Sequence, residues 1–130
     1  VVRHFSPVIL STSAIGKIIN IASVKGCNSS VGRLGYASSK AAVINITAGL
    51  AKELAPNILV NAVAPGFTLT EMTESTWDER IKKQVEGTLL GRMADPEEIA
   101  ETALFLLSSK CSYTTGQTLI VDGGFSIKND

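Results

Sequence analysis

Short runs of apolar, β-branched residues alternate with longer stretches rich in alanine and leucine along this chain. Each short run is bounded by Gly, Pro or Ser, which is typical of strands buried on both faces. The predicted strands are 18–22, 58–64 and 119–122. The predicted helices are 1–12, 36–55, 78–86 and 95–109. Because helices separate the strands, we predict an α/β fold whose parallel sheet is joined by right-handed crossovers.

Turn and loop residues set the expected limits of these elements. Pro7 is expected to bend or end the first helix, because proline donates no backbone hydrogen bond. Gly16 and Lys17 are expected to form the turn before the first strand. Residues 23–35, rich in Ser and Gly, and the Thr-rich residues 67–78 are expected to be irregular.

Two helix ends carry stronger signals. Pro56 is expected to stop the long Ala-rich helix. Asp95 is placed to cap the last helix, Pro96 suits its first position, and Glu98 is placed to close a capping box.

The carboxyl ends of the predicted strands are the expected place for a ligand. Parallel α/β sheets bind ligands in the crevice outside those ends. In this chain the strands end at Ser23, at Pro65 and Gly66, and at Gly123 and Gly124. We therefore predict a functional site at this edge of the sheet.

The composition narrows the classes of partner. The 130 residues are 45% hydrophobic and 18% charged, with 12 Lys and Arg against 12 Asp and Glu. This balance gives no basic field for nucleic acid or an anionic membrane surface. No apolar run approaches the roughly 20 residues that a membrane span needs. We predict a globular protein that binds neither partner.

Few residues offer metal or disulfide chemistry. Cys27 and Cys111 lie far apart in the sequence, and the single histidine, His4, is expected on a helix surface. These residues have no metal-ligand spacing and form no disulfide framework. We therefore expect no metal site and a reducing, cytoplasmic location.

The strongest local chemical pattern is a Tyr and a Lys one helical turn apart, Tyr36 and Lys40. An ammonium about 4 Å from a phenolate favours the ionised phenol by about 4 kcal/mol at an effective dielectric constant near 20. Such a Tyr can exchange a proton with an alcohol oxygen at neutral pH. Ser23, which ends a strand thirteen residues earlier, either caps the loop or brings a hydroxyl to the same edge. The pair alone is also found on exposed helices, so the position of Ser23 decides the interpretation.

Four segments together resemble the short-chain dehydrogenase/reductase family. The matching segments are 19–23, 36–42, 60–70 and 113–124. Their order and spacing are similar to those of the C-terminal half of that family's domain. The resemblance implies the last three strands, with flanking helices, of a Rossmann-type doubly wound parallel sheet.

The resemblance implies three catalytic residues. Tyr36 matches the proton donor of the family. Lys40 matches the residue that favours the phenolate of that Tyr and holds the nicotinamide ribose. Ser23 matches the residue that orients the substrate carbonyl. The implied reaction is hydride transfer between a nicotinamide cofactor and a carbonyl or secondary alcohol.

The resemblance also implies cofactor contacts beyond Tyr36 and Lys40. Pro65 and Gly66 match the wall beside the nicotinamide, and Thr70 matches a position that contacts the carboxamide or the phosphates. Residues 67–86 match the variable substrate lid. The cofactor is NADP or NAD, and the residue that chooses between them is not in this sequence.

The first half of the family's domain has no match here. The chain begins at Val1 rather than Met and contains no Gly-x-Gly-x-x-Gly turn, so we expect further residues upstream. We interpret residues 1–130 as a single unit, the C-terminal catalytic half, without the dinucleotide-binding half. We expect no turnover from these 130 residues alone.

Two functions follow from the resemblance. The first is an NAD(P)-dependent oxidoreductase, and the segments 65–72 and 90–93 resemble those of 3-oxoacyl-thioester reductases of fatty acid biosynthesis. The alternative is a non-catalytic fragment or oligomerisation module of the family. Both imply a homo-oligomer, a tetramer or a dimer, and the first also implies a small carbonyl or alcohol substrate.

Overall fold

The computed structural model describes residues 2–12, 15–29 and 31–127 of the chain. In these residues a three-stranded parallel sheet runs in the order β1-β2-β3. The strands are β1 (Gly16–Ile21), β2 (Ile58–Pro65) and β3 (Thr118–Val121). The helices are α1 (Val2–Thr12), α2 (Val24–Cys27), α3 (Leu34–Leu54), α4 (Glu71–Ser75), α5 (Glu79–Glu86) and α6 (Pro96–Leu107), followed by a 3₁₀ turn, η1 (Phe125–Ile127).

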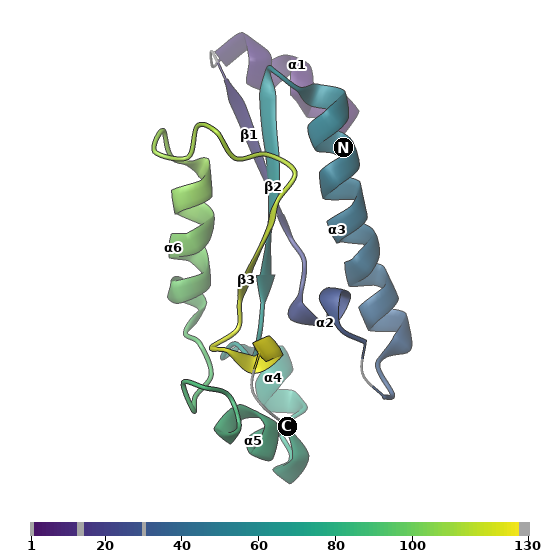
Figure 1. Ribbon diagram of the computed structural model, residues 1–130, viewed down its shortest axis with the longest axis vertical. Helices are drawn as coiled ribbons and strands as arrows, with labels where there is room; N and C mark the ends of the chain where they lie inside the picture. Colours follow the sequence, from purple (N-terminus) through teal and green to yellow (C-terminus); the bar gives the residue numbers. More distant parts are fainter. Residues whose placement is uncertain (1, 13–14, 30, 128–130) are drawn as a thin grey trace.

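The sheet lies between helices on both faces (Figure 1). On one face, Val63 of β2 packs with Ile99 of α6. On the other face, Ala62 and Ala64 of β2 pack with Val43 of α3. Successive β2 residues therefore serve opposite faces, which explains why the strand is apolar throughout rather than alternating. The predicted parallel, doubly wound α/β architecture is confirmed.

The two crossovers differ in hand, which corrects the prediction that both are right-handed. The strands follow one another in a single direction across the sheet, from β1 to β3. The connections through α3 and α6 run over opposite faces, so they must have opposite hands. In Figure 1, where β3 lies nearest the viewer, the connection through α6 is the left-handed one. Such connections are rare, because strand twist favours the right-handed form.

Gly16 and Lys17 belong to β1, so the predicted turn at these residues is wrong. The Gly16 amide donates to the Asn57 carbonyl at 2.9 Å, and Gly16 lies opposite Ile58 in the sheet. A Cβ atom at Gly16 would overlap the side chain of Ile9. Glycine is thus required because α1 crosses the sheet closely at this point, rather than because the chain turns.

The first helix continues past Pro7 to Thr12, so Pro7 does not end it; the predicted start at Val1 lies outside the described residues. His4 is exposed on this helix, as expected. At the other end of the chain, the predicted capping box of α6 is confirmed, with Asp95 and Glu98 as its two members.

Two segments predicted to be irregular contain short helices. The helix α2 lies within residues 23–35, and α4 lies within residues 67–78. The predicted start of α3 is also two residues late. The missed helices span four and five residues, which is too short for a helical repeat of apolar positions to be visible in the sequence.

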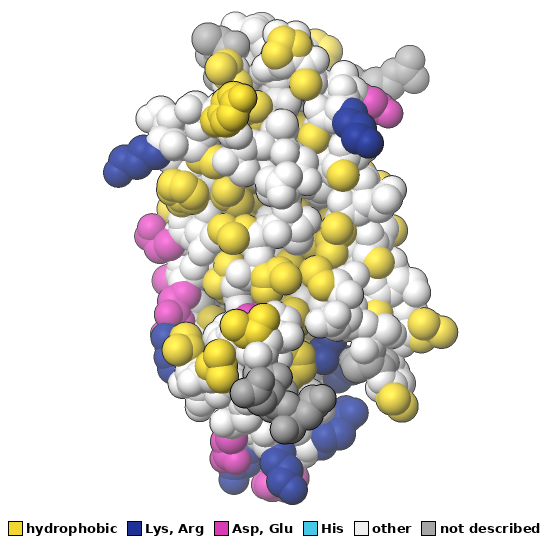
Figure 2. Space-filling view, in the orientation of Figure 1, with side chains coloured by type: hydrophobic (Ala, Val, Ile, Leu, Met, Phe, Trp, Pro, Cys, Tyr) yellow, Lys and Arg dark blue, Asp and Glu magenta, His cyan; other side chains and the backbone are white. Residues whose placement is uncertain are grey.

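The strands all point toward the end of the molecule that carries α2, α4 and α5 (Figure 1). Lys, Arg, Asp and Glu side chains gather over α4 and α5 in Figure 2, whereas apolar and uncharged side chains cover the middle of that face. Within the ranges that the structure describes, no helix is both long and apolar enough to cross a membrane.

Candidate active site

A cavity of about 760 Å³ opens at the carboxyl edge of the sheet. It lies among the ends of β1 and β2, the helix α2, the start of α3, and parts of α4, α5 and α6. The residues predicted as functional all line it: Ser23, Tyr36, Lys40, Pro65, Gly66 and Thr70. The third predicted strand end, Gly123 and Gly124, does not line this cavity; Gly123 lies instead against Leu90.

Ser23 is fixed at the point where β1 passes into α2. It is 7% exposed and is the N-cap of α2, where its Oγ accepts a hydrogen bond from the Lys25 amide at 3.2 Å. The cap uses an oxygen lone pair and leaves the hydroxyl proton available to a ligand. Both of the predicted roles, cap and hydroxyl donor, are therefore open to this one side chain.

Tyr36 and Lys40 lie one turn apart at the start of α3, as the spacing predicts. The Lys40 ammonium lies 5.9 Å from the centroid of the Tyr36 ring. The same ammonium donates to the carbonyl of Ile21, the last residue of β1, at 3.1 Å. Tyr36 is 41% exposed at the cavity. The ammonium is thus held between the end of β1 and the Tyr36 ring.

A glycine sets how closely α2 approaches α3. A Cβ atom on Gly26 would lie 2.7 Å from the carbonyl carbon of Lys40 and 2.9 Å from the amide nitrogen of Ala41. The only residue without a Cβ therefore allows the Ser23 and Lys40 segments to pack together. Sequence reasoning missed this contact, for which the only signal is a glycine three residues after Ser23.

The end of β2, the central strand of the sheet, borders the cavity. The Gly66 amide donates to the carbonyl of Val121 in β3 at 2.8 Å. A Cβ atom on Gly66 would lie 2.7 Å from the Cα atom of Asp122. Glycine is needed here because β2 and β3 come together as they leave the sheet, and Pro65 ends the strand beside it.

Thr70 already has a structural task. Its Oγ1 caps α4 by accepting from the Thr73 amide at 3.3 Å, and it lies 2.9 Å from Thr73 Oγ1. Thr73 Oγ1 in turn donates to the Thr68 carbonyl at 2.7 Å. A ligand that contacts Thr70 would thus meet a hydroxyl whose position is set by a threonine network.

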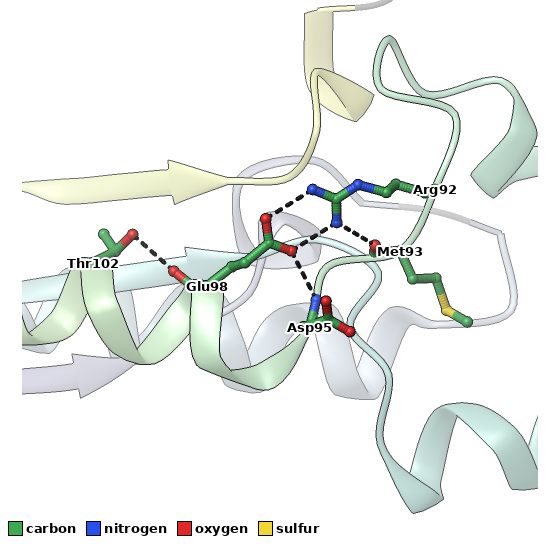
Figure 3. Close-up of polar contacts among 5 residues, drawn as sticks. All are labelled: Arg92, Met93, Asp95, Glu98 and Thr102. Atoms are coloured by element: carbon green, nitrogen blue, oxygen red, sulfur yellow. Dashed lines mark hydrogen bonds and ion pairs between the residues drawn. The ribbon is translucent and has the colours of Figure 1, made fainter.

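An ion pair fastens the turn before α6 to the start of that helix (Figure 3). The Arg92 guanidinium binds both carboxylate oxygens of Glu98, at 2.7 and 2.8 Å, and also donates to the Met93 carbonyl. Glu98 Oε2 accepts a further hydrogen bond from the Asp95 amide at 2.9 Å. Sequence reasoning found the cap but missed Arg92, because the distance between residues 92 and 98 follows no helical period.

This arrangement shifts the pKa of both partners. The Arg92 hydrogen bond, aided by the Asp95 amide, lowers the pKa of the Glu98 carboxyl to about 2. The hydrogen bond to Glu98 and its charge raise the pKa of Arg92. Both groups keep their charges over the physiological pH range.

The turn held by this ion pair also holds the start of the segment 67–86. Thr68 and Ala94 form an isolated parallel bridge. The Ala94 amide donates to the Phe67 carbonyl, and its own carbonyl accepts from the Leu69 amide, both at 2.9 Å. Residues 67–69 are therefore fixed on both sides, before the chain reaches Thr70.

The 3₁₀ turn η1 contacts two residues that line the cavity, Phe67 and Lys25, through Phe125. Its ring packs edge-on against Phe67, with centroids 5.3 Å apart, and the Lys25 ammonium lies 4.4 Å from its centroid. No pattern in the sequence predicted this contact. Among the residues described here, no group of three or more His, Cys, Asp or Glu side chains is arranged to hold a metal ion.

A phenol, an ammonium and a buried hydroxyl thus line one largely apolar cavity at the carboxyl edge of a parallel sheet. This is the usual place for a ligand in a Rossmann-type α/β protein. Such a set of groups can orient a carbonyl oxygen and exchange a proton with it.

Comparison with known proteins gives the family. A family model described as Enoyl-(Acyl carrier protein) reductase matches residues 1–126. The chain therefore belongs to the short-chain dehydrogenase/reductase family, as the sequence motifs indicated.

Particular relatives lie among the reductases and dehydrogenases of that family. The chain is 50% identical to the 3-oxoacyl-(acyl-carrier-protein) reductase of Aquifex aeolicus over 110 residues, covering 84% of this chain and 44% of the relative. The structure of 3-oxoacyl-(acyl-carrier-protein) reductase from Brucella melitensis matches with a TM-score of 0.83 at 38% identity, over 95% of this chain and 46% of the other. A 7α-hydroxysteroid dehydrogenase in complex with NADH and 7-oxo glycochenodeoxycholic acid matches with a TM-score of 0.88 at 35% identity, over 95% and 49%. The chain spans about half the length of these relatives.

Proposed function

We propose that this chain carries the proton-transfer site of an NAD(P)-dependent oxidoreductase, which transfers a hydride between the nicotinamide and a carbonyl or secondary alcohol. The observation that carries the proposal is that Ser23, Tyr36 and Lys40 line one cavity at the carboxyl edge of the sheet. The names of the relatives favour a 3-oxoacyl thioester as the substrate and a place in fatty acid biosynthesis.

Each of the three side chains has a task in this proposal. The Ser23 hydroxyl donates a hydrogen bond to the carbonyl oxygen and orients it. The Tyr36 hydroxyl gives its proton to the same oxygen during reduction and takes one back during oxidation. The Lys40 ammonium stabilises the phenolate that remains on Tyr36. The nicotinamide, when bound, supplies or accepts the hydride.

The donors at the cavity fit one end of the cofactor. Ribose hydroxyls are suited to the Tyr36 hydroxyl and the Lys40 ammonium, while Pro65, Gly66 and Thr70 would border the nicotinamide. The sequence contains no Gly-x-Gly-x-x-Gly turn for the pyrophosphate. We propose that residues 1–130 are a single unit, the catalytic half of the domain, and that the remaining cofactor contacts, including the choice of NADP or NAD, lie elsewhere in the protein.

Replacement of one hydroxyl tests the proposal. Tyr36→Phe in the protein as it is naturally expressed is expected to lower the oxidation of NADH or NADPH by a 3-oxoacyl thioester by about 10²- to 10⁴-fold. The reason is that the phenol is the proposed proton donor. The measurement is the steady-state loss of reduced-nicotinamide absorbance with each cofactor.

The matched control is Tyr113→Phe, which removes the same hydroxyl from a fully exposed tyrosine outside the cavity. We expect this variant to keep its turnover. Equal activity of the Tyr36→Phe variant and the unmodified protein would refute the proposed role of Tyr36.

A second candidate function is assembly. Large apolar side chains are exposed on α3, at Leu34 and Ile46, and on α6, at Leu104, Phe105 and Leu107. We propose that these faces join copies of the chain into a homo-oligomer, a tetramer or a dimer, in the cytoplasm. Tyr36→Phe separates the two functions, because it should remove turnover and leave the oligomeric mass unchanged.

A further inference from the structure

Among the residues that the structure describes, the charged side chains that line the cavity are all cations. They are Lys25, Arg33, Lys40 and Arg80, and no described Asp or Glu lines the cavity with them. The chain as a whole has 12 basic and 12 acidic residues. The positive lining is therefore a local arrangement and not a consequence of composition.

The helix α4 turns its acidic residues away from the cavity. Met72, Thr73 and Thr76 line it, whereas Glu71 and Glu74 do not. Since residues three and four apart share a helix face, one face of α4 presents methyl, thioether and hydroxyl groups to the ligand space.

The helix α5 behaves in the same way. Arg80, Ile81 and Gln84 line the cavity, whereas Glu79 does not. Asp78 uses its carboxylate to cap the helix, where Oδ1 accepts from the Ile81 amide at 2.7 Å. Of the charged residues of α5, only Arg80 faces the ligand space.

Arg33 and Arg80 have the guanidinium groups available for a ligand. Lys40 donates to the end of β1, and the Lys25 ammonium lies over the Phe125 ring. In the described part of the chain neither arginine forms an ion pair with a carboxylate. The two arginines come from segments far apart in the sequence, because Arg33 is the N-cap of α3 and Arg80 lies in α5.

The rest of the wall is largely apolar. Its apolar members include Val31, Phe67, Met72, Ile99 and Ala103. Guanidinium groups bind phosphate and carboxylate oxygens through paired hydrogen bonds. A wall of this kind suits a molecule that has both an apolar chain and an anionic group.

We infer that Arg33 and Arg80 select one class of carbonyl substrate. Its members carry an apolar chain and also a phosphate or carboxylate group. The inference rests on the proposed function, since it concerns the substrate of the same cavity. It assigns to these two arginines the discrimination between anionic and neutral carbonyl compounds, a task separate from proton transfer.

Matched pairs of substrates test the inference in the naturally expressed protein. Acetoacetyl-coenzyme A and S-acetoacetyl-N-acetylcysteamine present the same acetoacetyl thioester with and without the phosphorylated nucleotide end of coenzyme A. Levulinate and methyl levulinate present a ketone with and without a carboxylate. Arg80→Gln is expected to lower kcat/KM at least about tenfold for the anionic member of whichever pair the site selects, and less than about twofold for its neutral member.

Three further variants sharpen the result. Arg33→Gln is expected to show the same selective loss, and Arg80→Lys should regain part of it because the charge is kept. Lys83→Gln removes a cation from α5 outside the cavity and should leave the ratio of anionic to neutral substrate unchanged. An equal loss for both members of a pair, or a rise in the KM of the nicotinamide cofactor alone, would overturn the inference.

A binding measurement separates this inference from the proposed reaction. Calorimetric titration with butyryl-coenzyme A and with S-butyryl-N-acetylcysteamine needs no turnover. We expect Arg80→Gln to weaken binding of the coenzyme A thioester about tenfold without changing that of the neutral thioester. If this selective loss occurs in a protein that reduces no carbonyl, the proposed function fails and the anion site stands. If turnover is normal and the selective loss is absent, the proposed function stands and the anion site fails.

Discussion

Two of the regions that border the cavity are held in different ways. The first, which we name the frame, comprises β1, α2 and the start of α3, and it carries Ser23, Tyr36 and Lys40. The second, which we name the lid segment, comprises residues 67–86. In the frame, Ala22 and Ser23 are buried and Ala22 continues the pairing with β2. In the lid segment only Ile81 and Val85 are buried.

The hydrogen bonds of the two regions differ in range. Lys40 of the frame bonds to a residue nineteen positions earlier, at the end of β1. The start of the lid segment is tied to Ala94, but beyond Leu69 its hydrogen bonds reach residues at most five positions away. Segments held by local bonds with little burial open at low free-energy cost, whereas segments held by the sheet do not. The residues proposed for proton transfer therefore lie in the rigid region. Of the two arginines proposed to select substrates, Arg80 lies in the adaptable region and Arg33 lies at the edge of the rigid one.

The largest effect is expected from disturbing the frame at Gly26. Gly26→Ala would place a Cβ atom 2.7 Å from the backbone of Lys40, so α2 must move away from α3. We expect a loss of about 1–3 kcal/mol in the free energy of unfolding from this overpacking. We also expect turnover to fall roughly a hundredfold, because a displacement of about 1 Å misplaces Ser23 relative to Tyr36. Denaturant unfolding and steady-state rates measure the two effects.

Gly49→Ala is the matched control, since a Cβ atom at Gly49 of α3 would meet nothing within 4 Å. Alanine favours helices over glycine, so we expect a gain of about 0.5–1 kcal/mol and unchanged turnover. Equal behaviour of the two variants would contradict the close-packed frame. A loss of the oligomer at Gly49→Ala would instead show that another copy covers this face of α3.

The sequence was informative about the frame because the frame's functional residues are marked by helical spacing and by the end of a predicted strand. Tyr36 and Lys40 share a helix face by spacing, and Ser23 follows a buried apolar run, so their meeting at one edge could be predicted. The same reasoning found the cap at Asp95 and Glu98. These signals are local, and parallel sheets bring the ends of successive strands together.

Other features depend on contacts between distant segments and could not be predicted. Gly16 was misread as a turn residue because its close approach to Ile9 is visible only in space. The hand of the α6 crossover follows from which face the helix covers, and α6 carries exposed Leu104 and Phe105 as well as buried Leu106. With apolar residues on several sides, its sequence does not specify one face. The position of Arg80 at the cavity could not be predicted either, because it depends on which face of α5 is turned toward the cavity.

A smaller effect is expected from loosening the lid segment at its threonine cap. Thr70→Ala removes the oxygen that accepts from the Thr73 amide, and loss of such a cap costs about 1 kcal/mol. We expect the KM of the substrate to rise a few fold, and with it the KM of the nicotinamide cofactor that Thr70 is proposed to border. Because α4 contributes no buried residue, the global unfolding transition should stay nearly in place. Thr70→Ser keeps the cap and should restore the KM. A large fall in kcat for Thr70→Ala would mean instead that this hydroxyl takes part in the chemical step, as is proposed for the residues of the frame.

The smallest effect is expected at the exposed Arg92–Glu98 pair, and it depends on pH. The pKa of Glu98 falls from an ordinary 4.5 to about 2 in the folded chain, mainly through its hydrogen bond with Arg92. The ionised carboxylate therefore stabilises the folded chain above about pH 4.5, and this contribution is lost as the pH falls toward 2. Glu98→Gln cannot ionise and should melt at a lower temperature than the unmodified protein near neutral pH. The difference in melting temperature should shrink as the pH falls through this window. Glu101→Gln, on the same helix without an ion pair in the described residues, should show no such trend. A melting difference that is independent of pH would mean that Glu98 acts through the shape of its cap and not through its charge.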